Sequence, residues 1–293
     1  MNADDMMASP GKVHTATWQP SRFRSIASWL AYPAFLLLNR PSLGWFGNLV
    51  YDFALRCNGI AITFPGRHGL TRAEERFLAR HQADFQDGIL FDIGANGGAY
   101  ARHLHQLAPN ARIFAFEPHP RTFAALETNL RDTPKIHLIN AAVGESPGKL
   151  VLYDFADNDG STQASLNQAA VALFTPNLVT HEVDCTTVDA FMAGHGLDHI
   201  DLLKIDTEGH DLAVLRGAHN ALDEGRVKMI QFEFIGANIA TGVTMRAFFD
   251  ILPDYYLYRL CLNGDLLPLG RYDVKRHEIY VTHNLIAIRR ETP

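Results

Sequence analysis

From residue 88 onward, short apolar runs alternate along the chain with stretches of helical periodicity. The first run, ILFDI at 89–93, is continuous, as expected for a strand buried on both faces of a parallel sheet. The same pattern predicts strands at 112–117, 136–143, 199–206 and 228–234, and helices at about 97–107, 119–132, 210–222 and 243–252. Strands that alternate with helices are typical of an open sheet covered by helices on both faces.

Two regions depart from this alternation. Residues 148–155 alternate apolar and polar side chains, which predicts a small hairpin excursion. The C-terminal tail contains two strand-like pieces, 255–262 and 278–288, with a turn at 263–265 (NGD) between them. We therefore predict an α/β fold: a doubly wound, Rossmann-like sheet that is mostly parallel and ends in an antiparallel strand pair.

The N-terminal part of the chain lacks the strand–helix alternation, so we divide the chain into three parts. Residues 1–20 are expected to form a flexible leader, 21–85 a helical accessory region, and 86–293 the main domain. The accessory region contains a predicted helix that begins after Thr71, because Glu74 stands three residues further on, as in a capping box.

The most apolar run near the N-terminus lies at 26–38 (IASWLAYPAFLLL). It contains Pro33 and is too short to span a bilayer, which takes roughly 20 apolar residues, so we predict no transmembrane segment. The first residues carry two acids where a signal peptide would have positive charge. A core helix is the favoured interpretation. The alternative is a surface contact with a membrane or a partner, including a homodimer through this helical region.

Composition narrows the classes of partner. With 293 residues, 47% of them apolar and 20% charged, the chain can bury a sizeable core. The formal net charge of −6 argues against a general binder of nucleic-acid backbones. The three cysteines have no C-x-x-C spacing and predict neither a disulfide framework nor a zinc site, which fits a reducing, cytoplasmic environment.

The candidate chemistry begins at the turn after the first strand, Gly94-Ala95-Asn96-Gly97-Gly98. Glycines at the carboxyl end of a parallel strand let the backbone approach a ligand closely. The dinucleotide fingerprint G-x-G-x-x-G would need glycine in place of Asn96, and a phosphate loop would need Gly-Lys-Ser/Thr. The turn therefore disfavours both NAD and nucleoside triphosphates.

Acidic residues accompany the glycine turn. Asp92, near the end of the first strand, would repel a pyrophosphate but suits a cationic ligand without phosphate. S-adenosylmethionine (SAM), which carries a sulfonium and an amino group, is such a ligand. Glu117 ends the second strand, where a carboxylate can accept hydrogen bonds from both ribose hydroxyls. Glu117 alone does not distinguish SAM from NAD, whereas Asp92 together with Asn96 does.

Four motifs in order carry a family resemblance: FDIGANGG, FAFEPHP, INAAVG and IDLLKIDTEGHDLAVLRGA. Together they resemble the FkbM-type family of SAM-dependent methyltransferases, over roughly residues 70–290. The resemblance implies a class I methyltransferase fold, SAM as the methyl donor, and methylation of a hydroxyl on a sugar or natural product. It does not extend to the residues before about 65.

The resemblance also implies which residues bind the cofactor. The glycine turn would hold the methionine portion, the acid after the second strand would bind ribose, and residues after the second and third strands would border adenine. This set consists of Asp92, Gly94, Ala95, Asn96, Gly98, Glu117, Pro118, His119, Asn140, Ala141 and Asp206.

An alcohol is a poor nucleophile at neutral pH, so a base or a metal is expected near the acceptor. Asp206 is the first candidate because it ends a strand beside the glycine turn, and Glu208 and Glu233 could converge on it. Two mechanisms stay open: one carboxyl with a raised pKa could act as base, or Asp206 and Glu233 could chelate Mg²⁺. His210, directly after DTEG, is a further candidate for the base or an acceptor contact.

Other residues are candidates for the acceptor site. Lys204 precedes the strand-end aspartate by two residues and shares its face, so it either pairs with a carboxylate or lines this site. The polar stretch 156–168 is a long loop, and long loops in compact domains are often functional. Its hydroxyl groups on Ser161, Thr162 and Ser165 could bind a polyol acceptor.

The leading hypothesis is a SAM-dependent O-methyltransferase that acts on a hydroxyl of a sugar, a glycan intermediate or a natural product. An N- or C-methyltransferase of a small molecule would need the same cofactor residues. A different alternative is a catalytically inactive SAM-fold protein that serves as a binding or scaffold partner through the apolar segment 26–65. No nucleic-acid partner is expected.

Overall fold

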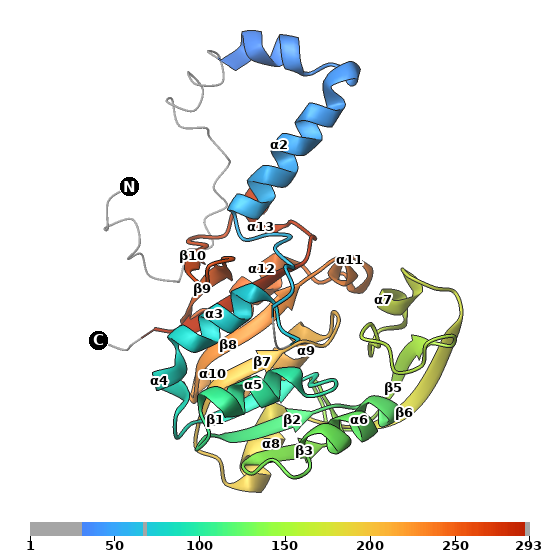
Figure 1. Ribbon diagram of the computed structural model, residues 1–293, viewed down its shortest axis with the longest axis vertical. Helices are drawn as coiled ribbons and strands as arrows, with labels where there is room; N and C mark the ends of the chain where they lie inside the picture. Colours follow the sequence, from blue (N-terminus) through green and yellow to red (C-terminus); the bar gives the residue numbers. More distant parts are fainter. Residues whose placement is uncertain (1–30, 67–68, 291–293) are drawn as a thin grey trace. The chain divides into compact units, whose positions relative to one another are not determined.

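The computed structural model describes residues 31–66 and 69–290 and divides the chain into two compact units, Met1–Asn58 and Gly59–Pro293 (Figure 1). The leader predicted at 1–20 lies outside the described residues. The division precedes the capping-box helix, which therefore belongs to the second unit, whereas the sequence analysis began the main domain at residue 86.

The described part of the first unit is helical. Residues 31–38 form a helix, followed by the 3-10 helix η2 (Pro41–Leu43) and by α2 (Gly44–Cys57). Large apolar side chains of this unit are exposed, among them Trp45 at 66% and Phe53 at 68%. The run favoured as a core helix is thus helical where it is described, but this unit does not bury it. Among the described residues, no helix combines the length and the hydropathy needed to cross a membrane.

An eight-stranded sheet with the order β10-β9-β11-β8-β7-β1-β2-β3 forms the centre of the second unit (Figure 1). The parallel strands are β1 (Ile89–Ile93), β2 (Arg112–Phe116), β3 (Ile136–Ile139), β7 (Ile200–Ile205) and β8 (Val227–Phe234). The antiparallel strands are β9 (Tyr255–Leu260), β10 (Leu266–Pro268) and β11 (His283–Arg289). The predicted fold class, a doubly wound and mostly parallel sheet, is confirmed. Its antiparallel C-terminal part has three strands where a pair was predicted, because the turn at 263–265 joins β9 to the short strand β10.

A second, three-stranded sheet lies beside the main one. It consists of β4 (Ala142–Val143), β5 (Gly148–Phe155) and β6 (Leu178–Thr186), with β6 in the middle. The predicted strand 136–143 was wrong in one respect, because its end, β4, pairs with β6 of the small sheet while β3 stays in the main one. The predicted hairpin excursion is formed by β5 and its antiparallel partner β6, a strand that the sequence analysis missed.

Helices cover both faces of the main sheet (Figure 1). One apolar core contains side chains of α3 (Arg72–Arg80), α4 (Gln82–Phe85), α5 (Ala99–Leu107) and α6 (Pro120–Leu130). The opposite core contains side chains of α8 (Val188–His195), α9 (Asp211–Arg216), α10 (His219–Asp223) and α12 (Met245–Ile251). The remaining short helices are α7 (Gln168–Ala172), α11 (Ala237–Thr241) and α13 (Val274–His277). The helix predicted at 210–222 is divided into α9 and α10 around Gly217.

The predicted capping box of α3 is confirmed. The side chain of Thr71 accepts a hydrogen bond from the N–H of Glu74, and the carboxylate of Glu74 accepts one from the N–H of Thr71. Phe77 and Leu78 of this helix are fully buried against the sheet. The strand order reverses between β1 and β7, and in such sheets a ligand binds beyond the carboxyl ends of the strands at this point.

Candidate functional site

A pocket of about 420 Å³ lies beyond the carboxyl ends of β1, β2 and β7. Gly94 follows β1, Glu117 follows β2, and Asp206 follows β7, and all three line the pocket. Its volume lies in the range of roughly 300–1,000 Å³ that is usual for small-molecule and cofactor sites. The sheet thus brings together strand ends that are more than 100 residues apart in the sequence (Figure 1).

Most of the predicted site residues line the pocket, and we call this lining the wall. They are Gly94, Ala95, Asn96, Glu117, Pro118, Ala141, Ser161, Thr162, Ser165, Asp206 and Glu208. The others do not line the pocket. These are Asp92, Gly98, His119, Asn140, Lys204, His210 and Glu233.

The glycine turn is shaped by close backbone approaches. Gly94 has a φ of +80°, and a Cβ there would lie 1.8 Å from the carbonyl oxygen of Asp206. Gly98 also has a positive φ, and its Cβ would lie 2.4 Å from Leu130 and 2.7 Å from Leu126 on α6. Gly94 is therefore needed at the pocket, whereas Gly98 is needed so that α5 can pack on α6.

The carboxyl group of Glu117 joins two strand ends. Its Oε2 accepts a hydrogen bond from the N–H of Asn96 at 2.9 Å, and its Oε1 accepts one from the N–H of His119 at 2.8 Å. Burial raises the pKa of this carboxyl to about 7, although both hydrogen bonds favour the ionised form. The amide of Asn140 donates to the carbonyls of Glu117 and Pro118 at 2.8 and 3.2 Å, so it fixes the backbone of these two lining residues.

Several carboxyl groups gather where β7 and β8 end. Glu208 lines the pocket in a left-handed conformation with φ of +51°, which is strained for a residue other than glycine. Burial, together with the charges of Asp206 and Asp211, raises its pKa to about 8. Glu233 lies off the wall, where its Oε1 accepts a hydrogen bond from Asn284 at 3.1 Å, and burial raises its pKa well above the usual value. A carboxyl of raised pKa is thus available at the pocket.

The proposed Mg²⁺ ligands, Asp206 and Glu233, gain no third ligand here. Among the described residues, these carboxylates do not belong to a group of three donor atoms that lie within 4.8 Å of one another. Mg²⁺ is usually held by one or two carboxylates plus substrate and water oxygens, so a third protein ligand is not required and the Mg²⁺ site stays a prediction.

Two other predicted residues are held away from the pocket. The ammonium group of Lys204 forms ion pairs with Asp92 and Asp206, so of the two alternatives for Lys204 the structure contains the pairing. His210, at the start of α9, lies under Gly144, whose Cβ would be 3.1 Å from the Nε2 of His210. Burial lowers the pKa of this imidazole. His210 does not line the pocket, and its role as a base or an acceptor contact stays a prediction.

The loop after β5 forms one side of the pocket. Asp154 is fully buried and accepts hydrogen bonds from the N–H groups of Gly160 and Ser161 at 2.7 and 2.9 Å, and also from the hydroxyl of Ser161. The hydroxyl of Ser165 donates to the carbonyl of Glu208 at 2.9 Å. The predicted polyol-binding hydroxyls of Ser161 and Ser165 thus have partners within the chain, and they fold the loop against the pocket.

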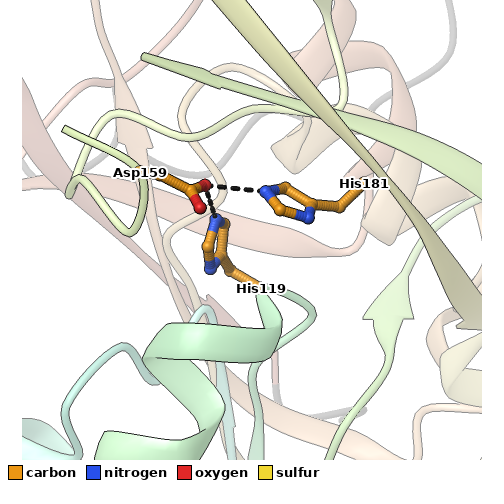
Figure 2. A group of neighbouring side chains, drawn as sticks. All are labelled: His119, Asp159 and His181. Carbon is orange, nitrogen blue, oxygen red and sulfur yellow. Dashed lines mark hydrogen bonds and ion pairs between the residues drawn. The ribbon is translucent and has the colours of Figure 1, made fainter. Parts of the chain in front are cut away.

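A cluster of His119, Asp159 and His181, which we call the latch, holds the same loop (Figure 2). The Oδ1 of Asp159 lies 3.0 Å from the Nε2 of His119 and 2.7 Å from the Nε2 of His181. These donor atoms are close enough to hold a metal ion. However, the Nδ1 of His119 accepts a hydrogen bond from the N–H of Arg121 at 3.2 Å. Because a neutral imidazole has one unprotonated nitrogen, Nε2 carries the proton and donates to Asp159 instead of binding a metal.

The apolar part of the wall was not predicted from the sequence. It consists of Ile93, Phe116, Ala142, Val143, Leu152, Ala164 and Leu166. The alternation at 148–155 predicted one face of β5 as apolar, and this could have pointed to Leu152. The apolar contribution of the loop, Ala164 and Leu166, depends on the hydrogen bonds of Asp154 that fold the loop and had no local signal.

The residues present fit SAM. The apolar wall can take an adenine ring, Glu117 retains lone pairs that can accept from ribose hydroxyls, and Asp206 and Glu208 supply acidic groups for a cationic ligand. Among the described residues that line the pocket, the only cationic side chain is that of Arg102, which is exposed. The fold and the pocket together define a class I SAM-dependent methyltransferase.

Comparison with protein families agrees with this class. The family model of the methyltransferase FkbM domain matches residues 92–260, more than half of the chain. The chain belongs to the FkbM methyltransferase family. The matched segment runs from Asp92 on β1 to the end of β9 and contains all the lining residues except Gly69.

Characterised relatives are similar over parts of the chain. The 2-O-methyltransferase NoeI of Sinorhizobium fredii is 29% identical over 62% of this chain and 79% of its own length. The 31-O-demethyl-FK506 methyltransferase FkbM of Streptomyces tacrolimicus is 27% identical over 57% of this chain and 74% of its own length. The hexuronic acid methyltransferase AglP of Haloferax volcanii is 28% identical over 47% of this chain, and the match spans about half, 52%, of AglP.

Solved structures show more distant similarity. A methyltransferase FkbM from Methylobacillus flagellatus is 16% identical, with a TM-score of 0.40 over 69% of this chain and 44% of the other. The precorrin-6y C5,15-methyltransferase of Geobacter metallireducens is also 16% identical, with a TM-score of 0.41 over 74% of this chain and 88% of the other.

Proposed function

We propose that this chain is an O-methyltransferase that transfers the methyl group of SAM to a hydroxyl of a sugar or a sugar-containing natural product. The observation that carries the proposal is the pocket in which Gly94, Glu117, Asp206 and Glu208 meet. The relatives support the kind of acceptor, because NoeI is named as a 2-O-methyltransferase, the FkbM protein of Streptomyces as a 31-O-demethyl-FK506 methyltransferase, and AglP as a hexuronic acid methyltransferase.

The cofactor would occupy the side of the pocket formed by the glycine turn. Gly94, Ala95 and Asn96 offer backbone groups, and Glu117 would accept hydrogen bonds from the ribose hydroxyls. Pro118 and Ala141, with the apolar wall, would border the adenine. When bound, SAM supplies an activated methyl group on a positively charged sulfur.

The chemistry left to the chain is orientation, exclusion of water and removal of the hydroxyl proton. Glu208 is the favoured base, because its carboxyl lines the pocket and has a pKa of about 8, close to a working pH. Asp206 would orient the acceptor and, through its charge, it helps to keep the pKa of Glu208 high. The hydroxyl proton would pass to the carboxylate of Glu208 as the oxygen takes the methyl group.

The first test is calorimetry of the purified protein with SAM and with S-adenosylhomocysteine (SAH). Binding of both is expected, and binding of neither would refute the cofactor. Methyl transfer is then measured on a panel of methyl glycosides and aminoglycosides, each with Mg²⁺ and with EDTA. Products methylated only at oxygen would support the proposal, whereas products methylated at nitrogen would favour the alternative. The homodimer and the cellular compartment stay predictions.

A further inference from the structure

Three charged side chains form an array beside the pocket. The Nζ of Lys204 lies 3.1 Å from the Oδ1 of Asp92 and 3.2 Å from the Oδ2 of Asp206. Asp92 on β1 and Lys204 on β7 are register partners in adjacent parallel strands, so both side chains stand on the same face of the sheet. Asp206 follows two residues after Lys204 and therefore points the same way. We call these residues the Asp92–Lys204–Asp206 array.

The array is buried at one end and open at the other. Asp92 has no exposed surface and Lys204 is 5% exposed, whereas the side chain of Asp206 is 38% exposed and lines the pocket. Burial raises the pKa of Asp92, and the charge of Lys204 opposes this. Burial also disfavours the charged form of Lys204, but the carboxylates of Asp92 and Asp206 outweigh it and raise the pKa of the ammonium.

Neighbouring groups confine the ammonium group further. Its nitrogen lies 4.9 Å from the centre of the Tyr100 ring. The hydroxyl of Tyr100 donates to the Oε1 of Gln231 at 2.7 Å, and the amide of Gln231 donates to the Oε1 of Glu74 at 2.8 Å. Helices α3 and α5 and strand β8 thus fix the ring that faces Lys204. A lysine held in this way defines a position for its partner Asp206.

We propose that Lys204 is a positioning residue that holds the Asp206 carboxylate on the pocket wall, and that Asp92 acts through Lys204 instead of contacting the cofactor. The inference rests on the proposed function and deepens it, because a fixed carboxylate lets the pocket prefer cationic SAM to its neutral product SAH. Loss of this preference, with binding retained, is the signature of a misplaced Asp206.

The test is a charge-conserving replacement, Asp92→Asn with Lys204→Met. It removes one negative and one positive charge, so the net charge near the pocket is unchanged and neither partner is left as an unpaired buried ion. Calorimetry gives the ratio of the Kd for SAH to the Kd for SAM. The double variant is expected to lower this ratio about tenfold, the equivalent of one charge-assisted hydrogen bond. Asp206→Asn is expected to lower it to a similar extent.

The two effects should not add. When Asp206→Asn is already present, the double replacement is expected to change the ratio less than about twofold, because Lys204 acts through Asp206. A matched control is Asp201→Asn with Lys228→Met, since this ion pair joins the other ends of β7 and β8. The control is expected to keep the wild-type ratio, whatever it does to thermal stability.

The outcomes separate the alternatives. A wild-type ratio in the double variant, or a further drop in the Asp206→Asn background, would overturn the inference. If the methionine variant does not fold, Lys204→Gln with Asp92→Asn replaces it; the weaker amide donor should lower the ratio about threefold, and an unchanged ratio again overturns the inference. Failure of the wild-type protein to bind either ligand would overturn the proposed function and this inference with it.

Discussion

Glu117 ties the glycine turn to the end of β2, because its Oε2 accepts a hydrogen bond from the backbone N–H of Asn96 at 2.9 Å. One carboxyl group therefore fixes the wall between β1 and β2 and at the same time faces the pocket. This double role explains why the group is buried in spite of its charge, and it makes the cofactor affinity sensitive to both substitution and pH.

Replacement of this carboxyl is expected to weaken cofactor binding strongly. Glu117→Ala would remove the two charge-assisted hydrogen bonds proposed to the ribose, so the Kd for SAM should rise about 100-fold. Because the pKa of Glu117 is about 7, the wild-type affinity should also fall as the pH is lowered from 8 to 6, where the carboxyl becomes protonated. Calorimetry across this range measures both effects. Glu127→Ala, which replaces a partly exposed acid on α6 that does not line the pocket, is the control and should bind SAM normally.

The proposed base predicts a pH dependence of the rate. With a pKa of about 8, Glu208 is mostly protonated at pH 6, so kcat/KM should rise with pH and level off above about 8. Glu208→Gln should lower the rate at least about 100-fold and remove this rise. The test is the initial rate from pH 6 to 9, measured with an acceptor of the panel that the wild-type protein methylates. A variant with the wild-type profile would assign the base elsewhere.

The same carboxyl links stability to pH. In the folded protein its pKa is about 8, above the usual 4.5, so the folded state holds the proton more tightly than the unfolded chain. The stability that this provides is fully present below pH 4.5 and is lost as the pH rises through 8. The wild-type Tm should therefore fall relative to that of Glu208→Gln between pH 5 and 8. Calorimetric melting of both proteins at pH 5 and 8 measures the difference. If the Tm of the two proteins changed equally with pH, the raised pKa of this carboxyl would be contradicted.

The glycine turn gives a prediction about folding. In Gly94→Ala the new Cβ would lie 1.8 Å from the carbonyl oxygen of Asp206, at a backbone angle that disfavours a side chain. We expect a loss of about 3 kcal/mol or more in the free energy of unfolding. The control is Gly194→Ala on α8, where nothing lies within 4 Å of the new methyl group, and it should stabilise the protein by up to about 1 kcal/mol. Urea denaturation of both variants compares them.

Most strands and helices of the main sheet could be predicted from the sequence, because apolar runs and helical periodicity are local signals. The strand 89–93 was predicted with its observed bounds, since an apolar run of this length between turn residues is too short for a typical helix. β6 was missed because its residues mix polar and apolar side chains and its partner β5 lies beyond the long loop. The end of the run 136–143 was assigned to the wrong sheet for the same reason. Its partner there, Cys185 on β6, is distant in the sequence.

The candidate site was predictable as far as topology determines it. Residues that follow β1, β2 and β7 had to meet, and Gly94, Glu117 and Asp206 do line one pocket. What each side chain contacts was not predictable, because it depends on partners from other elements. Asp92 lies one position inside its strand and turns to Lys204. His119 caps the N-terminus of α6 through Nδ1 and holds the loop through Nε2.

The latch provides the last prediction. Asp159→Ala removes the acceptor of His181 and leaves His119 only the Oδ2 of Asp154, 3.3 Å from its Nε2. The loop that carries Ser161, Ala164 and Leu166 to the pocket should therefore open. We expect faster amide hydrogen exchange in this loop and a Kd for SAM that is roughly tenfold higher. Asp157→Ala, an exposed acid on the same loop, should change neither. Since the Nε2–H of His119 donates a hydrogen bond to Asp159, EDTA and Zn²⁺ should leave the wild-type Tm unchanged. A rise of Tm with Zn²⁺ that is absent in Asp159→Ala would show instead that the three residues bind a metal.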